Sequence, residues 1–247
     1  MEKNKNYTIF KSNQRGHFKF SILETRHSFS FGNWYQPNRM GFGALKVLND
    51  DIFEPGQGFG MHPHDNMEII TIPLEGVVQH QDSTGGNGLI KPGQIQVMSA
   101  GSGVLHSEIN GDENQQLKLF QIWIEPDSID VEPRYDEAQI DYERINNSSK
   151  LLVSPDSREN SLMIHQKAFI SMMQIDKGNS LIYNKYDSNN GIFTLLVEGE
   201  AEANSREFTQ ELIEKRDSLE CQNTVDEISF TAKENSKLLI IEVPMNY

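Results

Sequence analysis

Met61-His62-Pro63-His64 and Leu105-His106-Ser107-Glu108 are the two stretches that decide how this chain folds. Each stretch places side chains that can bind a metal two residues apart, and residues i and i+2 of a β-strand project from the same face. Two such strands side by side would bring three imidazoles and one carboxylate into one space. A divalent first-row transition metal accepts that ligand set and keeps coordination positions open for chemistry. The two stretches therefore predict a metal centre built on neighbouring strands.

The sequence on both sides of these stretches predicts strands. Apolar and polar residues alternate over short segments about ten residues apart, with glycine and proline between them and no helical period. The loop at residues 83–88 is glycine-rich, but it lacks the Lys and following Ser or Thr of a phosphate loop and leads into another strand, which favours a hairpin. This pattern is typical of an all-β protein made of antiparallel sandwiches or barrels. In the first half, the predicted strands lie at residues 18–22, 44–48, 67–74, 94–98 and 117–124.

The second half continues the strand pattern after a polar segment. Residues 126–150 are rich in Asp, Glu, Asn and Ser and predict a linker. Residues 207–216 are the best helical candidate, with loop and strand as the open alternative, and residues 7–10 predict an edge strand or a loose arm. Further strands are predicted at residues 162–164, 168–175, 180–183, 193–197 and 237–243.

A weak internal repeat links the two halves. Thr71-Ile72-Pro73-Leu74-Glu75-Gly76 resembles Thr194-Leu195-Leu196-Val197-Glu198-Gly199, an offset of 123 residues. Two similar barrels in tandem would produce this offset. The corresponding offsets from the metal-binding stretches lead to positions without histidine, so the second half has the architecture without the metal site. We expect an N-terminal metal-binding domain at residues 1–140 and a C-terminal domain at residues 141–247.

Composition excludes several classes of protein. A net charge of -14 and a pI near 4.9 repel a polyanion, so direct binding to nucleic acid is not expected. The start of the chain lacks the apolar region of a secretory signal, and nowhere do eighteen apolar residues run together, which predicts a cytoplasmic protein without a membrane segment. The single cysteine, Cys221, excludes an internal disulfide and is expected to be a packing residue.

The motif around the first pair of histidines resembles that of the cupin superfamily. Five residues separate Gly56 from His62, Glu68 follows His64, and a glycine closes the motif at Gly76. The second motif has four residues between its glycine and its histidine, and in this it resembles a narrower family, the pirins. The resemblance covers nearly the whole chain and is strongest to the bacterial branch of quercetin 2,3-dioxygenases. Its other motifs are Arg26-His27-Ser28-Phe29-Ser30-Phe31-Gly32, Met40-Gly41-Phe42-Gly43-Ala44-Leu45, Ser99-Ala100-Gly101-Ser102-Gly103 and Gln121-Ile122-Trp123-Ile124.

The resemblance implies a bicupin, two tandem barrels of which only the N-terminal one holds metal. Strand parity alone lets both Glu68 and Glu108 face the same space as His62. The resemblance selects the glutamate of the His-x-Glu stretch and makes Glu68 a supporting group that orients a ligand histidine or holds a turn. The implied ligands are His62, His64, His106 and Glu108, and the metal is expected to be Fe(II), with Mn, Co, Ni, Cu or Zn as alternatives.

Two functions remain open on this basis. The first is a quercetin 2,3-dioxygenase: the metal anchors the 3-hydroxyl of a flavonol, Glu108 acts as catalytic base, and O2 opens the ring with loss of carbon monoxide. The second is a regulatory metal-binding protein, a redox-sensing partner of transcription factors or metabolic enzymes. The remaining histidines, His80 and His165 among them, are expected to be structural or exposed. Trp123 is expected in the core.

Overall fold

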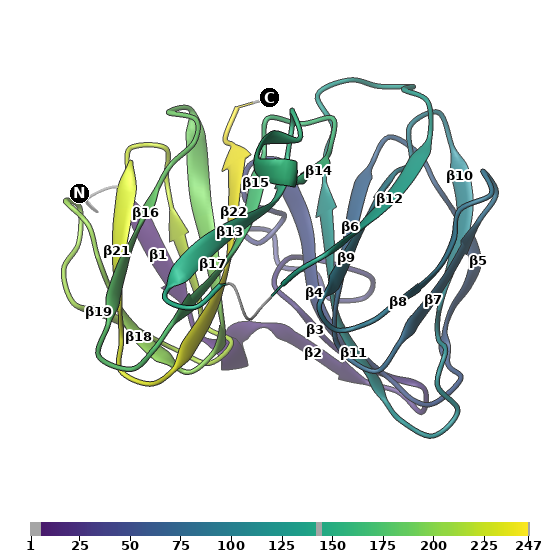
Figure 1. Cartoon of the computed structure of the whole chain (residues 1–247), viewed down its shortest axis with the longest axis horizontal. Helices are drawn as coiled ribbons and strands as arrows, with labels where there is room; N and C mark the ends of the chain where they lie inside the picture. Colours follow the sequence, from purple (N-terminus) through teal and green to yellow (C-terminus); the bar gives the residue numbers. More distant parts are fainter. Residues whose placement is uncertain (1–5, 142–144, 247) are drawn as a thin grey trace.

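Mostly antiparallel strands build two barrels, drawn side by side in Figure 1. This computed structural model describes residues 6–141 and 145–246. Each barrel has one large and one small sheet, and within the described residues two short 3-10 helices, η1 (Ser12–Gln14) and η3 (Arg158–Asn160), lie in the connections. The predicted bicupin architecture is confirmed.

The first barrel is built from one large and one small sheet. In spatial order the strands of the large sheet are β12 (Arg134–Gln139), β9 (Gln94–Ser99), β6 (Glu68–Glu75), β11 (Leu117–Ile124), β4 (Leu45–Phe53), β3 (Leu23–His27) and β2 (Gly16–Lys19). The small sheet has the order β5 (Gly58–His64), β10 (Val104–Asn110), β7 (Val78–Asp82) and β8 (Asn87–Ile90). Strands β7 and β8 pair as a hairpin, as predicted for the glycine-rich loop between them.

The second barrel repeats this plan. Its large sheet has the order β1 (Tyr7–Phe10), β20 (Ser218–Cys221), β17 (Asn190–Glu198), β22 (Ser236–Pro244), β15 (Phe169–Ile175), β13 (Ser148–Ser154) and β14 (Leu162–Met163). Its small sheet has the order β16 (Ser180–Asn184), β21 (Glu227–Ala232), β18 (Glu200–Asn204) and β19 (Glu211–Glu214). The first strand of the chain is thus an edge strand of the second barrel, which decides between the two alternatives left open for residues 7–10.

The two large sheets pack against each other through apolar outer faces. Ile70 on β6 and Ile122 on β11 belong to one buried cluster with Leu195 on β17 and Ile241 on β22. Because successive residues of a strand point to opposite faces, the intervening residues of β6 and β11 point into the first barrel. These inward residues include Thr71 and Gln121, which are polar.

The interiors of the barrels differ in chemistry. The second barrel is filled by one apolar cluster that includes Ile192, Phe230 and the buried Cys221. In the part of the chain that the structure describes, the interior of the first barrel has two small apolar clusters, one around Phe53 and one around Ile69, with polar side chains between them. Among the described residues, both clusters of side chains that could hold a metal lie in the first barrel.

Two local predictions are wrong. Residues 207–216 form no helix, and the open alternative of loop and strand is confirmed: Ile213 lies on strand β19 inside the second barrel with Phe208, while Leu212 points outward. The segment 126–150 is not only a linker, because it contains strand β12, which pairs with β9. Part of that segment, residues 142–144, lies outside the described residues, and the domain division between residues 140 and 141 stays a prediction.

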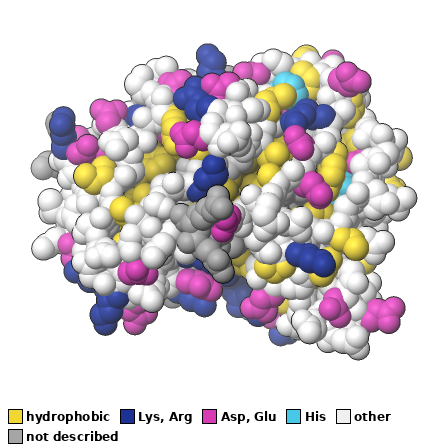
Figure 2. All heavy atoms as spheres, in the orientation of Figure 1, with side chains coloured by type: hydrophobic (Ala, Val, Ile, Leu, Met, Phe, Trp, Pro, Cys, Tyr) yellow, Lys and Arg dark blue, Asp and Glu magenta, His cyan; other side chains and the backbone are white. Residues whose placement is uncertain are grey.

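The surface and the helices carry little further information on function. Acidic and basic side chains are interspersed over the face drawn in Figure 2, so the negative charge is not concentrated there. Within residues 6–141 and 145–246, neither helix has the length or apolar character needed to cross a membrane.

Candidate metal centre

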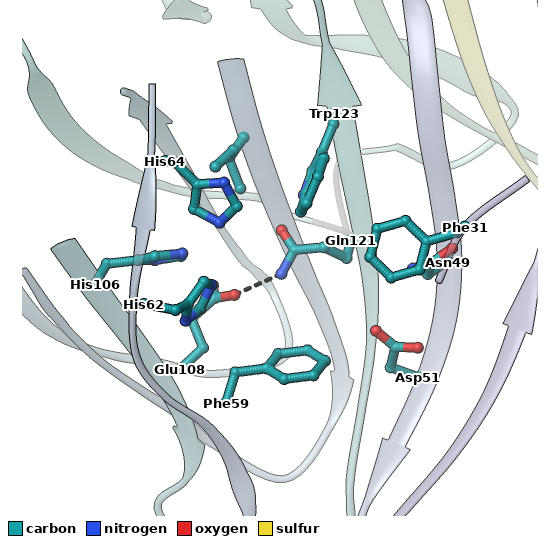
Figure 3. A pocket seen from close by; sticks show the side chains of 11 residues that line it. Phe31, Asn49, Asp51, Phe59, His62, His64, His106, Glu108, Gln121 and Trp123 are labelled. Carbon is teal, nitrogen blue, oxygen red and sulfur yellow. Dashed lines mark hydrogen bonds between the residues drawn. The ribbon is translucent and has the colours of Figure 1, made fainter. Parts of the chain in front are cut away.

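The two histidine-bearing stretches lie on adjacent strands of the small sheet, as the sequence predicts. His62 pairs directly with His106 across β5 and β10, and Val104 pairs with His64. The ring centroids of His62 and His106 are 4.4 Å apart, and those of His64 and His106 are 4.9 Å apart. Ligand nitrogens of the three imidazoles all lie within 4.8 Å of one another (Figure 3).

His106 provides the strongest sign that a metal fits. It is 1% exposed, and neither ring nitrogen has a hydrogen-bond partner within the described part of the chain. A buried polar atom without a partner is destabilising, and a bound metal ion would remove that cost at one nitrogen. Burial, together with the neighbouring histidines, lowers the pKa of His106 to about 3. The imidazole is therefore neutral at pH 7 and offers a lone pair.

The other two histidines are also suited to ligation. Nδ1 of His62 lies 2.7 Å from the carbonyl oxygen of Gly60, and because a carbonyl only accepts, Nδ1 carries the proton. Its Nε2 then keeps the lone pair that a metal needs. Burial, followed by the proximity of His62, lowers the pKa of His64 to about 4, so that ring is neutral as well.

Glu108 lies 2% exposed behind the histidines, held by three donors. Its Oε1 accepts hydrogen bonds from the Thr71 hydroxyl at 2.7 Å and from the Gln96 amide at 2.6 Å. Its Oε2 accepts from the Gln121 amide at 2.5 Å, the bond drawn in Figure 3. A carboxylate has roughly four lone-pair sites, two on each oxygen. One site on Oε2 is therefore left for a metal ion or a proton.

His80 is part of this site, which the sequence did not reveal. It is fully buried, and its ligand atom lies within 4.8 Å of those of His106 and Glu108. However, its Nε2 bonds to Asp82 at 2.9 Å and its Nδ1 faces the Gln96 amide at 3.4 Å. Both nitrogens are thus engaged by protein, so His80 supports the site from behind. His80 and Asp82 lie two residues apart and so share one face of a strand, and this spacing was the sign in the sequence that His80 could join a site.

Glu68 does not support a ligand histidine, contrary to the sequence-based expectation. It lies on the outer face of β6 with Ile70, directed toward the second barrel. There it accepts a hydrogen bond from Ser99 at 2.7 Å and bonds His165 at 3.1 Å. The parity argument fails because a turn separates His64 from β6, and strand parity is not carried through a turn.

An aromatic-walled cavity of about 160 Å³ opens in front of the three histidines. The Trp123 ring lies 4.8 Å from that of His64, and the Phe31 ring lies 5.4 Å from Trp123. Phe59 stands on the other side, 6.0 Å from His62. Trp123 is only partly buried and lines this wall, so its expected place in the core is corrected.

Comparison with known proteins places this architecture in a family. A model described as Pirin matches residues 10–124, and one described as Quercetinase C-terminal cupin domain matches residues 151–243. A bacterial pirin from Escherichia coli, solved in complex with nickel(II), superimposes with a TM-score of 0.88 at 36% identity over 96% of this chain and 99% of its own. The chain belongs to the pirin family.

Curated relatives of this pirin carry dioxygenase names. Quercetin 2,3-dioxygenase from Escherichia coli is 49% identical over 156 residues, which is 63% of this pirin and 66% of that protein, just under two thirds of its length. A protein named putative quercetin 2,3-dioxygenase from Pseudomonas aeruginosa is 37% identical over 229 residues, 92% of this pirin and 95% of its own length.

These findings support a divalent metal at the cluster in the first barrel of this pirin. The assignment of His62, His64, His106 and Glu108 as its ligands stays a prediction. Its physical basis is the pair of free nitrogens on His106 and the lone pair left on Glu108 Oε2.

Proposed function

We propose that this pirin is a metal-dependent dioxygenase that opens the central ring of a flavonol such as quercetin with O2 and releases carbon monoxide. The observation that carries the proposal is a group of three imidazoles and one buried carboxylate at the end of an aromatic-walled cavity. Such a site combines metal binding with a place for a flat aromatic molecule.

In this proposal His62, His64, His106 and Glu108 hold Fe(II), and Mn, Co, Ni, Cu or Zn are compatible with the same donors. The bound metal would supply Lewis acidity that lowers the pKa of the flavonol 3-hydroxyl and an open position for its oxygen.

The residues of the cavity contribute orientation and proton transfer. Trp123, Phe31 and Phe59 present apolar ring faces that hold a planar substrate and exclude water. Glu108 Oε2 has one lone pair that no protein donor uses, so it would hold the metal and, by shifting off the metal, accept the proton of the 3-hydroxyl. The donors on Glu108 fix the direction of this lone pair, which is what a catalytic base requires.

The names of the relatives support the same reaction, although they describe those proteins. The regulatory alternative uses the same metal site without turnover. Because both functions need the same metal site, only a measurement of turnover distinguishes them.

Oxygen uptake with quercetin tests the proposal. Protein loaded separately with Fe(II), Ni(II) and Mn(II) is mixed with quercetin while oxygen and carbon monoxide are measured. We expect one molecule of O2 to be consumed and one molecule of carbon monoxide to be released for each ring opened. We expect Glu108→Gln to abolish turnover. Glu75→Gln, at an exposed glutamate paired with Lys118, is the matched control. Stoichiometric metal without oxygen uptake for any of the three metals would refute the enzyme and favour the regulatory function.

A further inference from the structure

The metal cavity continues into a second chamber on the side away from the histidines. This chamber has a volume of about 190 Å³ and shares Phe31, Asn49, Asp51 and Phe59 with the first. Sites for small molecules commonly have volumes of about 300–1,000 Å³, so neither chamber alone reaches the usual size and the two together do. Figure 3 shows Asn49 and Asp51 beyond Gln121 as seen from the histidines.

One row of polar residues joins the two chambers. Gln96, Thr71, Gln121, Asn49 and His27 lie directly opposite one another on β9, β6, β11, β4 and β3. The first three hold Glu108, as described above. The last two lie in the wall of the second chamber.

Polar atoms in the part of this row beyond Gln121 lack hydrogen-bond partners in the described part of the chain. Within the described residues, Asn49 Oδ1 and His27 Nδ1 have no hydrogen-bond partner, and neither do the Thr25 hydroxyl and both carboxylate oxygens of Asp51. All four side chains are more than nine-tenths buried, with exposed fractions of 3%, 6%, 3% and 1%. Thr25 faces Asp51 across β3 and β4, and its hydroxyl partly offsets the rise in the pKa of Asp51, so the two make a weak polar contact without full hydrogen-bond geometry.

Such a concentration of unpartnered polar atoms in one chamber calls for an occupant. Buried polar groups in folded proteins nearly always have partners, and exceptions that cluster in a cavity indicate a ligand or ordered water. The rest of the wall is aromatic: Phe18 lies 5.6 Å from the His27 ring, and Phe31 lies 5.2 Å from it. The chamber thus combines flat apolar surfaces with a polar floor.

We propose that the second chamber is a recognition subsite for a phenolic ring of the substrate, remote from the metal. The identity of the substrate as a flavonol rests on the proposed function. A phenol fits because its ring packs on the aromatic walls while its O–H donates to Asn49 or Asp51 and accepts from Thr25.

The charges in the chamber favour a neutral phenol over an anion. Burial raises the pKa of Asp51 to about 7 and lowers that of His27 to about 4, so neither group supplies a positive charge. Asp51 can donate or accept, according to pH.

The test uses titration calorimetry to compare the affinities of two flavonols for nickel-loaded protein in oxygen-free buffer. Quercetin carries hydroxyls on its outer rings, and 3-hydroxyflavone has only the 3-hydroxyl. We expect quercetin to bind at least about tenfold more tightly, as one or two hydrogen bonds in a buried site would give. Thr25→Val and Asp51→Leu should each reduce this ratio about five- to tenfold and leave the Kd of 3-hydroxyflavone unchanged.

Thr194→Val is the matched control, because Thr194 also has a buried hydroxyl without a hydrogen-bond partner among the described residues but lies on β17 in the second barrel. Near-ultraviolet circular dichroism and nickel content verify that each variant folds and keeps its metal. Equal affinity for the two flavonols, binding of neither, or an unchanged ratio in both variants overturns the subsite. Binding with the expected ratio but without oxygen uptake overturns the proposed reaction and leaves the subsite standing.

Discussion

Asp51→Asn should stabilise the metal-free protein, and by an amount that depends on pH. Asp51 is 1% exposed, and burial raises its pKa from 3.8 to about 7, with Asp50 and Glu108 adding repulsion. Between these two values the unfolded chain has lost the proton and the folded protein keeps it, so the stability of the wild type falls as pH rises. Each pH unit is worth about 1.4 kcal/mol, which gives an upper bound of about 4 kcal/mol across the interval.

Asparagine at this position cannot ionise, so the stability of the variant does not fall with rising pH on account of residue 51. We expect the free energy of unfolding of the variant to exceed that of the wild type by little near pH 4. The difference should grow through pH 5 and 6 to about 2–4 kcal/mol at pH 7.5 and stay level above that. Urea unfolding followed by tryptophan fluorescence measures it, with chelator present because a bound cation nearby would itself favour the carboxylate.

Asp127→Asn serves as the control, because Asp127 is exposed in the loop after β11 and its carboxylate accepts a hydrogen bond from the neighbouring Ser128 hydroxyl. Its effect should stay within about 0.5 kcal/mol at every pH. A difference between wild type and Asp51→Asn that does not change between pH 4 and 7.5, or that has the opposite sign at pH 7.5, would show that Asp51 is ionised in the fold and would refute the reasoning.

Three further predictions concern metal binding, the contact between the barrels and the cysteine. His106→Leu should abolish stoichiometric nickel binding by elemental analysis, yet stabilise the metal-free protein by about 1–3 kcal/mol because two unpartnered buried nitrogens are removed; a destabilised apo variant would contradict this. His165→Ala should destabilise by about 1–3 kcal/mol in urea without loss of metal, because the buried Glu68 carboxylate loses a partner, whereas the exposed His17→Ala should have almost no effect. Cys221 should resist a thiol reagent in the native protein and react after unfolding, because burial raises its pKa; rapid reaction at pH 8 would count against this.

The strands and the metal-binding stretches were predictable because each depends on local spacing. His62 and His64 share a face by the period of a strand, and the position of β10 beside β5 follows from the cupin resemblance. The residues that hold Glu108 were less visible. Thr71 and Gln121 are polar residues within apolar strands, a sign of a polar barrel interior, but their convergence on one carboxylate depends on the register of β6, β9 and β11.

The errors arise where tertiary contacts override local pattern. Phe208, Leu212 and Ile213 are spaced as on a helix, but ten residues are too few for periodicity to decide, and burial of Phe208 and Ile213 in the barrel favours the strand. Glu68 was assigned to the wrong face because strand parity does not carry through the turn before β6, and its burial gave no warning because the outer face of β6 is itself covered by the second barrel. Nothing in one sequence reveals that a barrel's outer surface is covered.

The position of β1 has a consequence for how the chain is made. Tyr7 pairs with Cys221, so the partner of β1 is synthesised only after the whole of the first barrel. At about 5–20 residues per second, roughly 10–40 s pass before that partner exists. The second barrel's large sheet is therefore completed by a strand made before the first barrel, and the connection from β1 to β2 links the two barrels in addition to their packing. A fragment that starts after β1 would expose the edge of β20, and we expect such a fragment to aggregate or to bind an added peptide of the β1 sequence.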